Sequence, residues 1–170
     1  MAIPRSDFER NLRILKKSRL YPISVSNDCF AIARLFTALK QQNDVTTCIV
    51  HVESYSLSIL MLTPNGHIYP WTFFSRQPWE NRYDEILKHL QDVVKYYQFK
   101  LRLEPIDQFV ISGLAAQNNT FRNSLEAFST VPVTIWNPFE HIKTHDTLSL
   151  EESVQYGAVI APTLGLALPL

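Results

Sequence analysis

Glycine is scarce in this 170-residue chain, which contains only Gly66, Gly113, Gly157 and Gly165. Loops that wrap phosphate groups need several glycines, because backbone N–H groups must approach the ligand at dihedral angles that other residues avoid. Residues 108–125, QFVISGLAAQNNTFRNSL, have the strand–glycine–helix order of a nucleotide-binding loop but contain a single glycine. The sequence therefore predicts a loop of this shape without a complete phosphate cradle.

The chain also lacks an excess of charge and a cysteine motif. Its 16 basic and 16 acidic side chains balance to a formal net charge of +0, so no global field is expected to attract nucleic acid or an anionic membrane. Cys29 and Cys48 form no CxxC pair. Their apolar surroundings predict buried free thiols in a reducing compartment and no zinc or redox site.

Targeting and membrane-spanning segments are lacking as well. The N-terminus has no apolar stretch typical of a signal peptide, and no segment approaches the roughly 18 apolar residues that cross a bilayer. These absences predict a soluble, cytoplasmic protein or a soluble piece of a larger one.

Residues 1–44 are predicted to form a helix, a strand and a second helix. Ser6 and Glu9 have the spacing of a capping box before an amphipathic helix, whose basic run over residues 12–19 favours a solvated face over a nucleic-acid patch. Residues 21–25 predict a short strand. Asn27 or Asp28 then caps a helix over residues 29–42, which is apolar nearly all round and is predicted to be buried.

Residues 45–170 predict a second unit with the element order β-β-β-α-β-α-β-α. Apolar runs at 46–52, 56–63 and 67–74 predict three strands, with Asn65-Gly66 as a hairpin turn and Pro70 marking an edge strand or bulge. Two helices then alternate with two strands, and Pro162 is expected to divide a final helix. These later elements are predicted at residues 82–97, 108–112, 119–128, 133–136 and 153–168.

This element order is typical of an α/β domain with a mixed five-stranded sheet and helices on both faces. Three antiparallel strands followed by alternating helices and strands is the layout of a ribonuclease-H-like layer, which is also the repeating half of the actin and sugar-kinase architecture. The predicted fold class is thus a ribonuclease-H-like, actin-like ATPase subdomain over residues 45–170. Residues 1–44 are interpreted as a remnant or extension of a neighbouring lobe.

Four local patterns, in order along the chain, resemble one family. They are YPISVSNDCFAIARLF from Tyr21, IVHVESYSLSILML from Ile49, FVISGLAAQNNTFRNSLE from Phe109, and VPVTIWNPFEHI from Val131 with the closing GLAL. On these patterns the chain resembles the C-terminal lobe of the actin-like type IV pilus assembly proteins of the PilM family. It is similar also to their relatives, the cytoplasmic domains of GspL in type II secretion and of MshI in mannose-sensitive pilus biogenesis.

The resemblance implies a non-catalytic scaffold at an inner-membrane platform that assembles a type IV pilus, a competence system or a type II secretion system. The implied partners are the cytoplasmic tail of a single-pass, PilN-like membrane protein and an assembly ATPase, with no nucleic acid and no direct membrane insertion. A homodimer is an open alternative. The implied location is cytoplasmic, peripheral to the inner membrane of a bacterium. Because the family's tail-binding groove lies mainly in the other lobe, no residue here is assigned to it.

The chain departs from the family pattern where nucleotide-binding members approach metal and phosphate through an Asp and a Gly. His51 and Glu53 stand there instead, and a glutamate blocks backbone approach and places negative charge beside a phosphate. The family's Gly-Gly pair becomes Gly113-Leu114, so a bulky side chain fills the nucleotide space. The resemblance thus implies a degenerate loop with no cofactor and no enzymatic activity. Its positions are His51, Glu53, Ser54, Ser112, Gly113 and Leu114.

An actin-like ATPase completed by another lobe, whose phosphate loop would lie upstream of Met1, is the alternative. A ribonuclease-H-like nuclease is a weaker alternative, since it needs three or four carboxylates around metal ions. Glu53, Asp84 and Glu85 are candidates, but Ser112 occupies the corner where a ligand is needed, and Asp107 lies at the other end of its strand. His141 and His145 have helical zinc spacing, although a solvated loop is favoured there.

Aromatic residues are dense in residues 68–79, IYPWTFFSRQPW. They cannot all face one core if the strand alternates. One interpretation places them under the neighbouring helix, and the other makes an exposed patch that docks a partner, because Trp and Tyr are favoured interface anchors. The candidate patch is Tyr69, Trp71, Phe73 and Trp79, with Phe74 as a further member of the cluster.

Overall fold

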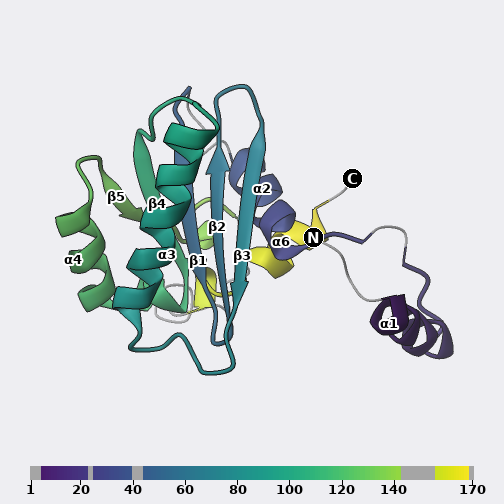
Figure 1. The fold of residues 1–170 in the computed structure, drawn as a ribbon. Helices are drawn as coiled ribbons and strands as arrows, with labels where there is room; N and C mark the ends of the chain where they lie inside the picture. Colours follow the sequence, from purple (N-terminus) through teal and green to yellow (C-terminus); the bar gives the residue numbers. More distant parts are fainter. Residues whose placement is uncertain (1–4, 23–24, 40–43, 143–155, 169–170) are drawn as a thin grey trace.

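A five-stranded mixed sheet forms the centre of the protein. The computed structural model describes residues 5–22, 25–39, 44–142 and 156–168 (Figure 1). The strands are β1 (Thr47–Val52), β2 (Ser56–Leu62), β3 (Ile68–Phe74), β4 (Gln108–Gly113) and β5 (Val133–Ile135). Their spatial order is β3-β2-β1-β4-β5, in which β1, β2 and β3 are antiparallel while β4 and β5 run parallel to β1. The predicted fold class is confirmed.

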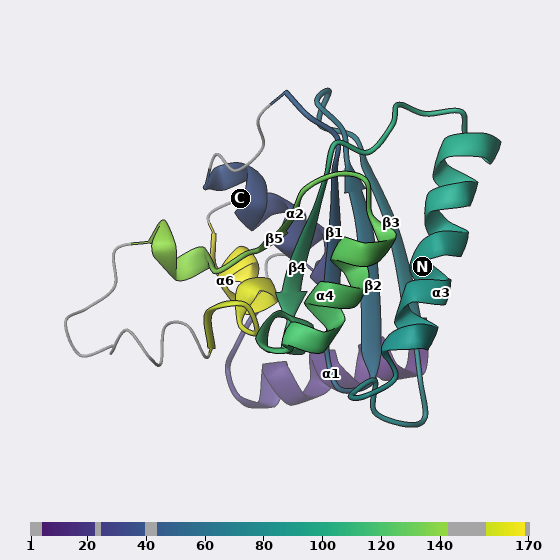
Figure 2. The same cartoon turned by 90° about the vertical axis from the view of Figure 1, so that its left-hand side faces the viewer.

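Helices cover both faces of this sheet (Figures 1 and 2). The described α-helices are α1 (Arg5–Lys17), which does not contribute to either core, α2 (Asp28–Ala38), α3 (Tyr83–Lys95), α4 (Asn119–Phe128) and α6 (Ala161–Ala167), and a π-helix, Tyr96–Lys100, continues α3. Helices α3 and α4 pack on one face and α2 and α6 on the other. Pro162 lies in the first turn of α6, where its missing N–H costs nothing, so the expected division of the last helix is confirmed.

Side-chain alternation along β1 explains why both faces need helices. Cys48, Val50 and Val52 point into the core beneath α3 and α4, whereas Ile49 belongs to the core beneath α2 and α6. Every residue of β1 is buried, as expected for a central strand covered on two sides. The sequence of β1 is therefore apolar without interruption except at Thr47 and His51.

The β2–β3 hairpin is confirmed, although its turn differs from the predicted two-residue form. Among turn residues 63–67 only Gly66 has a positive φ, 77°, and its N–H donates to the Thr63 carbonyl at 2.9 Å. The chain therefore turns through Pro64 and Asn65 and reverses at a left-handed glycine. Pro70 lies on β3, which is an edge strand as predicted, because proline has no N–H for a second neighbour.

The predicted capping box at Ser6 is wrong. Helix α1 already includes Arg5, so Ser6 lies within the helix and not at the non-helical N-cap position that a capping box requires. Glu9 instead accepts a hydrogen bond from Arg5 Nε at 2.7 Å, one helical turn away. The cap of α2, by contrast, is confirmed at Asn27, whose side chain accepts from the Phe30 N–H at 2.9 Å.

The predicted strand over residues 21–25 is wrong for the residues that the structure describes. Tyr21, Pro22 and Val25 lie outside any strand, and Tyr21 is 76% exposed. Residues 23 and 24 lie outside the described residues. A strand is stable only beside a pairing partner, and no strand of the described sheet pairs with this segment.

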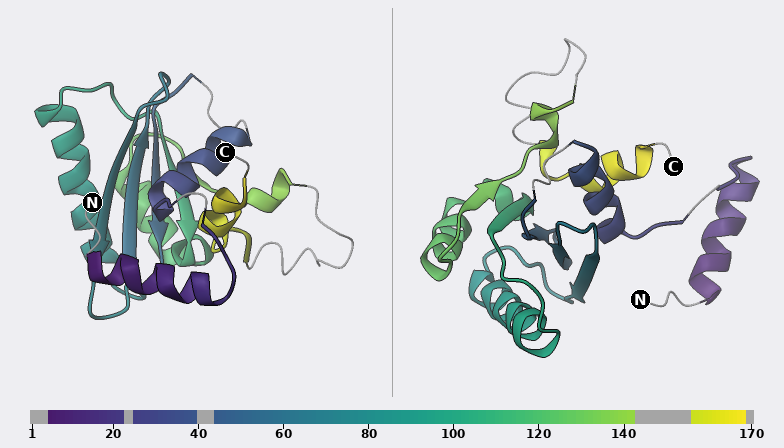
Figure 3. Two further views of the ribbon diagram at one scale, coloured as in Figure 1. Left: turned by 90° about the vertical axis from the view of Figure 1, so that its right-hand side faces the viewer. Right: turned by 90° about the horizontal axis from the view of Figure 1, so that it is seen from above.

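Helix α2 packs against the sheet, while α1 stands apart from the sheet and its helices (Figure 3). The contact between α2 and α6 is close, since a Cβ on Gly165 would lie 1.9 Å from the Ala31 carbonyl oxygen. The division of the chain at residue 44 into two units stays a prediction.

Gly113 ends β4 at a point where no other residue fits. Its φ is 76°, and a Cβ there would lie 2.2 Å from the Val52 carbonyl oxygen. We expect Gly113→Ala to destabilise the fold by roughly 3 kcal/mol or more, since overlap with β1 adds to the cost of a backbone region reserved for glycine. Gly66→Ala is the matched control, with a positive φ but open space, and should cost about 1 kcal/mol. Urea unfolding measures the stability of both variants, and equal losses of stability would contradict this prediction.

Candidate functional site

The carboxyl ends of β1 and β4 form one edge of the sheet, and the six predicted loop positions meet there. His51 pairs with Ser112 and Val52 with Gly113 in the parallel register, while Glu53 and Leu114 follow the two strand ends. Parallel strands place their carboxyl ends together, which is where ligands bind in open α/β sheets. The structure thus brings the residues together, and their loss of nucleotide binding stays a prediction.

A buried hydrogen-bonded chain runs through His51, which is 1% exposed. The Ser112 hydroxyl donates to the Ala158 carbonyl at 3.1 Å, which uses its single proton, so Ser112 Oγ must accept from His51 Nδ1 at 3.1 Å. The other ring nitrogen, Nε2, lies 3.3 Å from Glu53 Oε1. Both ring nitrogens of His51 therefore lie within hydrogen-bond distance of an oxygen.

The pKa values of two carboxyl groups near this histidine are shifted in opposite directions. The hydrogen bond from His51 lowers the pKa of Glu53 below its ordinary value, and the Ser56 hydroxyl, 3.1 Å from Glu53 Oε2, adds to the effect. Burial raises the pKa of Asp28, in the first turn of α2, and repulsion from Glu53 raises it further. The surroundings at this edge therefore stabilise the charged form of Glu53 and disfavour the charged form of Asp28.

A polar row crosses the sheet beneath the start of α2. In the strand register Ser112 lies opposite His51, His51 opposite Ser58, and Ser58 opposite Thr72. Thr72 Oγ1 lies 3.4 Å from the Cys29 thiol of α2. Sequence reasoning missed Ser58 and Thr72, although a serine at every second position of SLS in an apolar strand is a signal of this kind.

The edge opens into a depression of about 500 Å³, called here the carboxyl-edge depression. Its lining consists of Asp28, Glu53, Ser54, Tyr55, Ser56, Phe74, Leu114 and Val159. Leu114 is part of this lining, and its predicted effect on nucleotide binding stays a prediction. Tyr55 and Phe74 are 56% and 71% exposed at its rim, so the depression combines acidic groups with uncovered aromatic surface. Sequence reasoning named Phe74 only in the aromatic cluster and Asp28 only as a helix cap, and it did not identify Tyr55.

The carboxylates needed for a nuclease do not converge. Asp107 lies at the amino end of β4, where its Oδ2 accepts from the Thr46 N–H at 2.7 Å, while Glu53 follows the carboxyl end of β1. Glu85 on α3 is engaged by Arg82. Within the described ranges no group of three potential ligands could hold a metal ion. His141 is exposed, and His145 lies outside the described residues.

The aromatic cluster divides between the two faces of β3. Tyr69, Trp71 and Phe73 pack partly buried against the core beneath α3, and the Phe73 ring lies 4.3 Å from that of His89. Trp79 is 2% exposed, so its prediction as an exposed interface anchor is wrong. Its backbone N–H donates to the Ser54 carbonyl at 2.8 Å, which holds the loop after β3 against the edge and buries the indole. Phe74 points to the opposite face and remains exposed.

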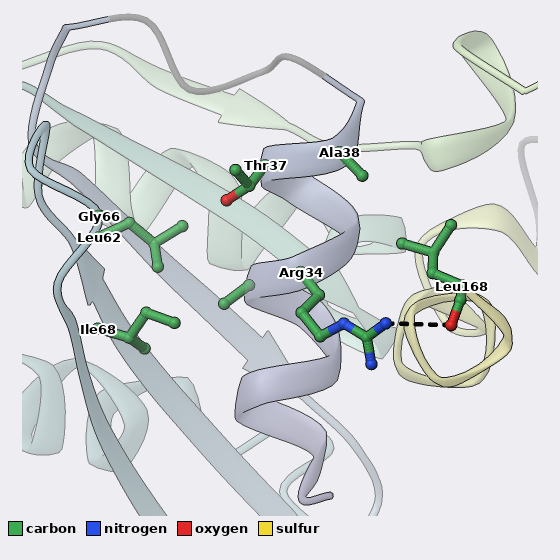
Figure 4. A pocket seen from close by; sticks show the side chains of 8 residues that line it. Arg34, Thr37, Ala38, Leu62, Gly66, Ile68 and Leu168 are labelled. Carbon is green, nitrogen blue, oxygen red and sulfur yellow. Dashed lines mark hydrogen bonds between the residues drawn. The ribbon is translucent and has the colours of Figure 1, made fainter. Parts of the chain in front are cut away.

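A second groove, about 480 Å³, lies between α2, the β2–β3 hairpin and the end of α6 (Figure 4). Among the described residues that line it, Arg34 carries the one ionisable side chain, and its Nη2 donates to the Leu168 carbonyl at 3.0 Å. The rest of the described lining is mainly aliphatic, including Leu62 and Ile68. The described part of the lining therefore offers apolar surface and contains no acid–base pair of the kind used in catalysis.

The fold of the chain is similar to that of solved structures of other proteins. A PilM–PilN type IV pilus biogenesis complex contains a chain that matches 94% of this one with a TM-score of 0.73 at 16% identity. The chain has an actin-like fold. A Bacteroides thetaiotaomicron protein of unknown function with an actin-like ATPase fold matches 80% of the chain, with a TM-score of 0.54 and 16% identity. No protein-family model and no curated protein matches the sequence.

The actin-like chain spans about half the length of these two structures, 56% of the first and 48% of the second. At such identity the likeness concerns the fold. Among the helices that the structure describes, none has the length and apolar character needed to cross a membrane.

The opposite pKa shifts of Asp28 and Glu53 predict opposite effects of their substitution on stability. Glu53→Gln should lower stability at pH 7 by about 0.5–1 kcal/mol, a modest loss because the Glu53 side chain is 39% exposed. A carboxylate whose pKa is lower in the folded state stabilises the fold at pH values above its unfolded pKa. The loss of stability in Glu53→Gln should therefore vanish as pH falls from about 5 toward 3. Asp28→Asn should raise stability at pH 7, since a raised folded pKa disfavours the charged form, and its gain should vanish over a similar range. Denaturant unfolding at each pH tests this prediction, and a change of stability with the same sign in both variants would contradict it.

Proposed function

We propose that the chain is a non-catalytic scaffold in the assembly of a type IV pilus, or of a related competence or type II secretion system. It acts through protein–protein contacts at the cytoplasmic face of a bacterial inner membrane. The observation that carries this proposal is the match of nearly the whole chain to part of a PilM–PilN complex. The four sequence patterns shared with the PilM family support it independently.

The proposed partner is the cytoplasmic tail of a single-pass, PilN-like membrane protein, with an assembly ATPase as a further contact. This follows from the complex in which the structurally similar chain was solved. The relation to GspL and MshI extends the proposal to other secretion platforms. No residue of this chain is assigned to the tail, because the chain covers only 56% of that protein.

The proposal that the chain is non-catalytic rests on the residues at the carboxyl ends of β1 and β4. Glu53 places a charged carboxylate with a lowered pKa where a phosphate would need a glycine N–H, and Leu114 lines the same depression. Gly113 is needed for the close packing of β4 on β1, so its presence has a structural reason apart from any ligand. The name of the second similar structure, an actin-like ATPase fold, keeps a nucleotide-binding function as the competing candidate.

The tail proposal predicts direct binding. A fluorescent peptide of the cytoplasmic tail from the PilN-like protein of the same assembly system should bind the purified chain saturably, with a scrambled peptide as control. Fluorescence anisotropy gives the dissociation constant, and a value weaker than about 1 mM would correspond to less than about 4 kcal/mol and contradict a direct contact. Retention of the assembly ATPase on the immobilised chain tests the second contact.

The scaffold proposal also predicts that ATP and magnesium produce no saturable heat in a calorimetric titration of the chain. The reason is the charge and bulk that Glu53 and Leu114 place at the edge. A double variant, Glu53→Gly with Leu114→Gly, removes both obstacles and is the matched comparison. Tight binding of ATP by the unaltered chain would overturn the blocked-edge argument and favour the actin-like ATPase.

A further inference from the structure

The π-helix that follows α3 exposes apolar side chains at the end of that helix. Phe99 is 77% exposed, Tyr96 49% and Leu101 37%, and these three residues are called here the π-helix patch. The π-helix leads toward the amino end of β4, so the patch lies at the opposite end of the sheet from the carboxyl-edge depression (Figure 1). Exposed apolar side chains that cluster in this way are typical of an interaction surface.

The wide turn of the π-helix brings these side chains together. The Leu101 N–H donates to the Tyr96 carbonyl at 3.0 Å, which places Leu101 one turn beyond Tyr96, with Phe99 in the turn between them. Tyr97 points the other way and is buried in the core. Helical turns of this type are rare and occur frequently at functional sites.

Trp71 on β3 forms the border of the patch. Its ring centroid lies 6.4 Å from that of Tyr96, and the two ring planes meet at 78°, which is an edge-to-face contact. Trp71 is itself partly buried against the core, so the contact holds Tyr96 beside the edge strand. The aromatic surface of β3 is therefore continuous with the π-helix patch at Trp71.

Basic side chains are interleaved with the patch. Residues 95–102, KYYQFKLR, contain Lys95, Lys100 and Arg102 and no acidic residue, and all three cations are exposed. No ion pair in the described part of the chain involves them. Salt screens charges that are more than about 8 Å apart, so this local cluster acts on a nearby surface although the whole chain has no net charge.

This combination of side chains suits an anionic lipid surface. Aromatic rings are favoured at the level of lipid headgroups, and long basic side chains can lay their apolar stems along the patch while their charges reach lipid phosphates. Helix α3 lies at the margin of the molecule beside β3 (Figure 2), so its end can approach a flat surface. Single-stranded nucleic acid instead needs a continuous basic groove, and Asp92 and Glu104 border the basic cluster on both sides in the sequence.

We propose that the π-helix patch docks the protein on an anionic phospholipid surface. Phe99 and Tyr96 enter the headgroup layer, and the three cations bind lipid phosphates. The contact is peripheral, because no helix of the described residues is long and apolar enough to cross a bilayer. It does not rest on the proposed contact with a PilN-like tail, although two attachments to one membrane strengthen each other.

Co-sedimentation of the full chain with phosphatidylglycerol vesicles tests the charge requirement. Binding should be at least about tenfold weaker to phosphatidylcholine vesicles, because each basic residue at an anionic surface strengthens binding by about fivefold. Binding to phosphatidylglycerol should also fall between about 50 mM and about 500 mM NaCl, since salt screens the attraction.

A double variant, Lys100→Gln with Arg102→Gly, should weaken this binding by about tenfold or more. Arg102 has a left-handed φ of 55°, which glycine adopts more easily, so this variant should retain the fold. Lys16→Gln with Lys17→Gln is the matched control, because it removes the same charge from the end of α1. The control should weaken binding by less than about threefold, as expected for charges away from the docking surface.

The apolar side of the contact is tested by Phe99→Ser, which should weaken vesicle binding by about fivefold or more. Phe74→Ser is its control, since Phe74 is a similarly exposed phenylalanine at the other end of the sheet, and its effect should stay within about twofold. Circular dichroism of each variant checks that the fold is retained.

Tryptophan fluorescence shows which surface meets the lipid. Trp79 and Trp136 are 2% and 4% exposed, whereas Trp71 borders the patch, so vesicles of brominated phosphatidylglycerol should quench the emission of Trp71. Trp71→Phe should abolish the quenching while the chain still sediments with the vesicles.

Four results would overturn the proposal. They are a chain that stays in solution with phosphatidylglycerol vesicles at about 50 mM NaCl, sedimentation that the Lys100/Arg102 variant does not weaken, and sedimentation without quenching of Trp71, which would assign the contact to another surface such as α1. The fourth is an oligothymidylate that displaces the vesicles and binds through the same residues, which would make this a nucleic-acid surface. The peptide titration proposed above contains no lipid, so its outcome is independent of these.

Discussion

The parallel pairing of β1 with β4 is the contact on which the rest of the structure depends. It joins the antiparallel hairpin layer to the α/β layer, and it brings His51 and Ser112 side by side. The pairing is so close at its carboxyl end that only a glycine fits at position 113, beneath the Val52 carbonyl. Gly113 N–H and the Ser112 hydroxyl both bond the Ala158 carbonyl, which fixes the segment leading into α6. One strand pair thus positions both helical layers and the candidate site.

The same edge supports the proposed protein contacts rather than phosphate chemistry. A phosphate-binding edge presents free N–H groups, whereas here the Gly113 N–H is already used within the fold. The buried histidine is also committed, to a serine on one side and a glutamate on the other. What remains open to solvent is acidic and aromatic surface, which suits basic and apolar groups of a protein.

The balanced composition conceals a division of charge along the chain. Residues 5–19 carry a net charge of +4 and the remaining residues carry −4. The composition alone therefore predicts no global field, although the two parts of the chain carry opposite charges.

The sequence by itself determined the secondary-structure order, the hairpin, the edge position of β3 and the fold class, because these depend on local patterns such as alternation, Pro70 and Asn65-Gly66. It also identified His51, Glu53, Ser112 and Gly113 as neighbours through resemblance. Only the tertiary structure decided that Tyr21, Pro22 and Val25 lie outside any strand and that Trp79 is buried. It also decided that Ser58 lies beside His51, with Thr72 one strand further along the same row. Pairing, burial and cross-strand proximity depend on residues distant in sequence, so no local pattern contains them.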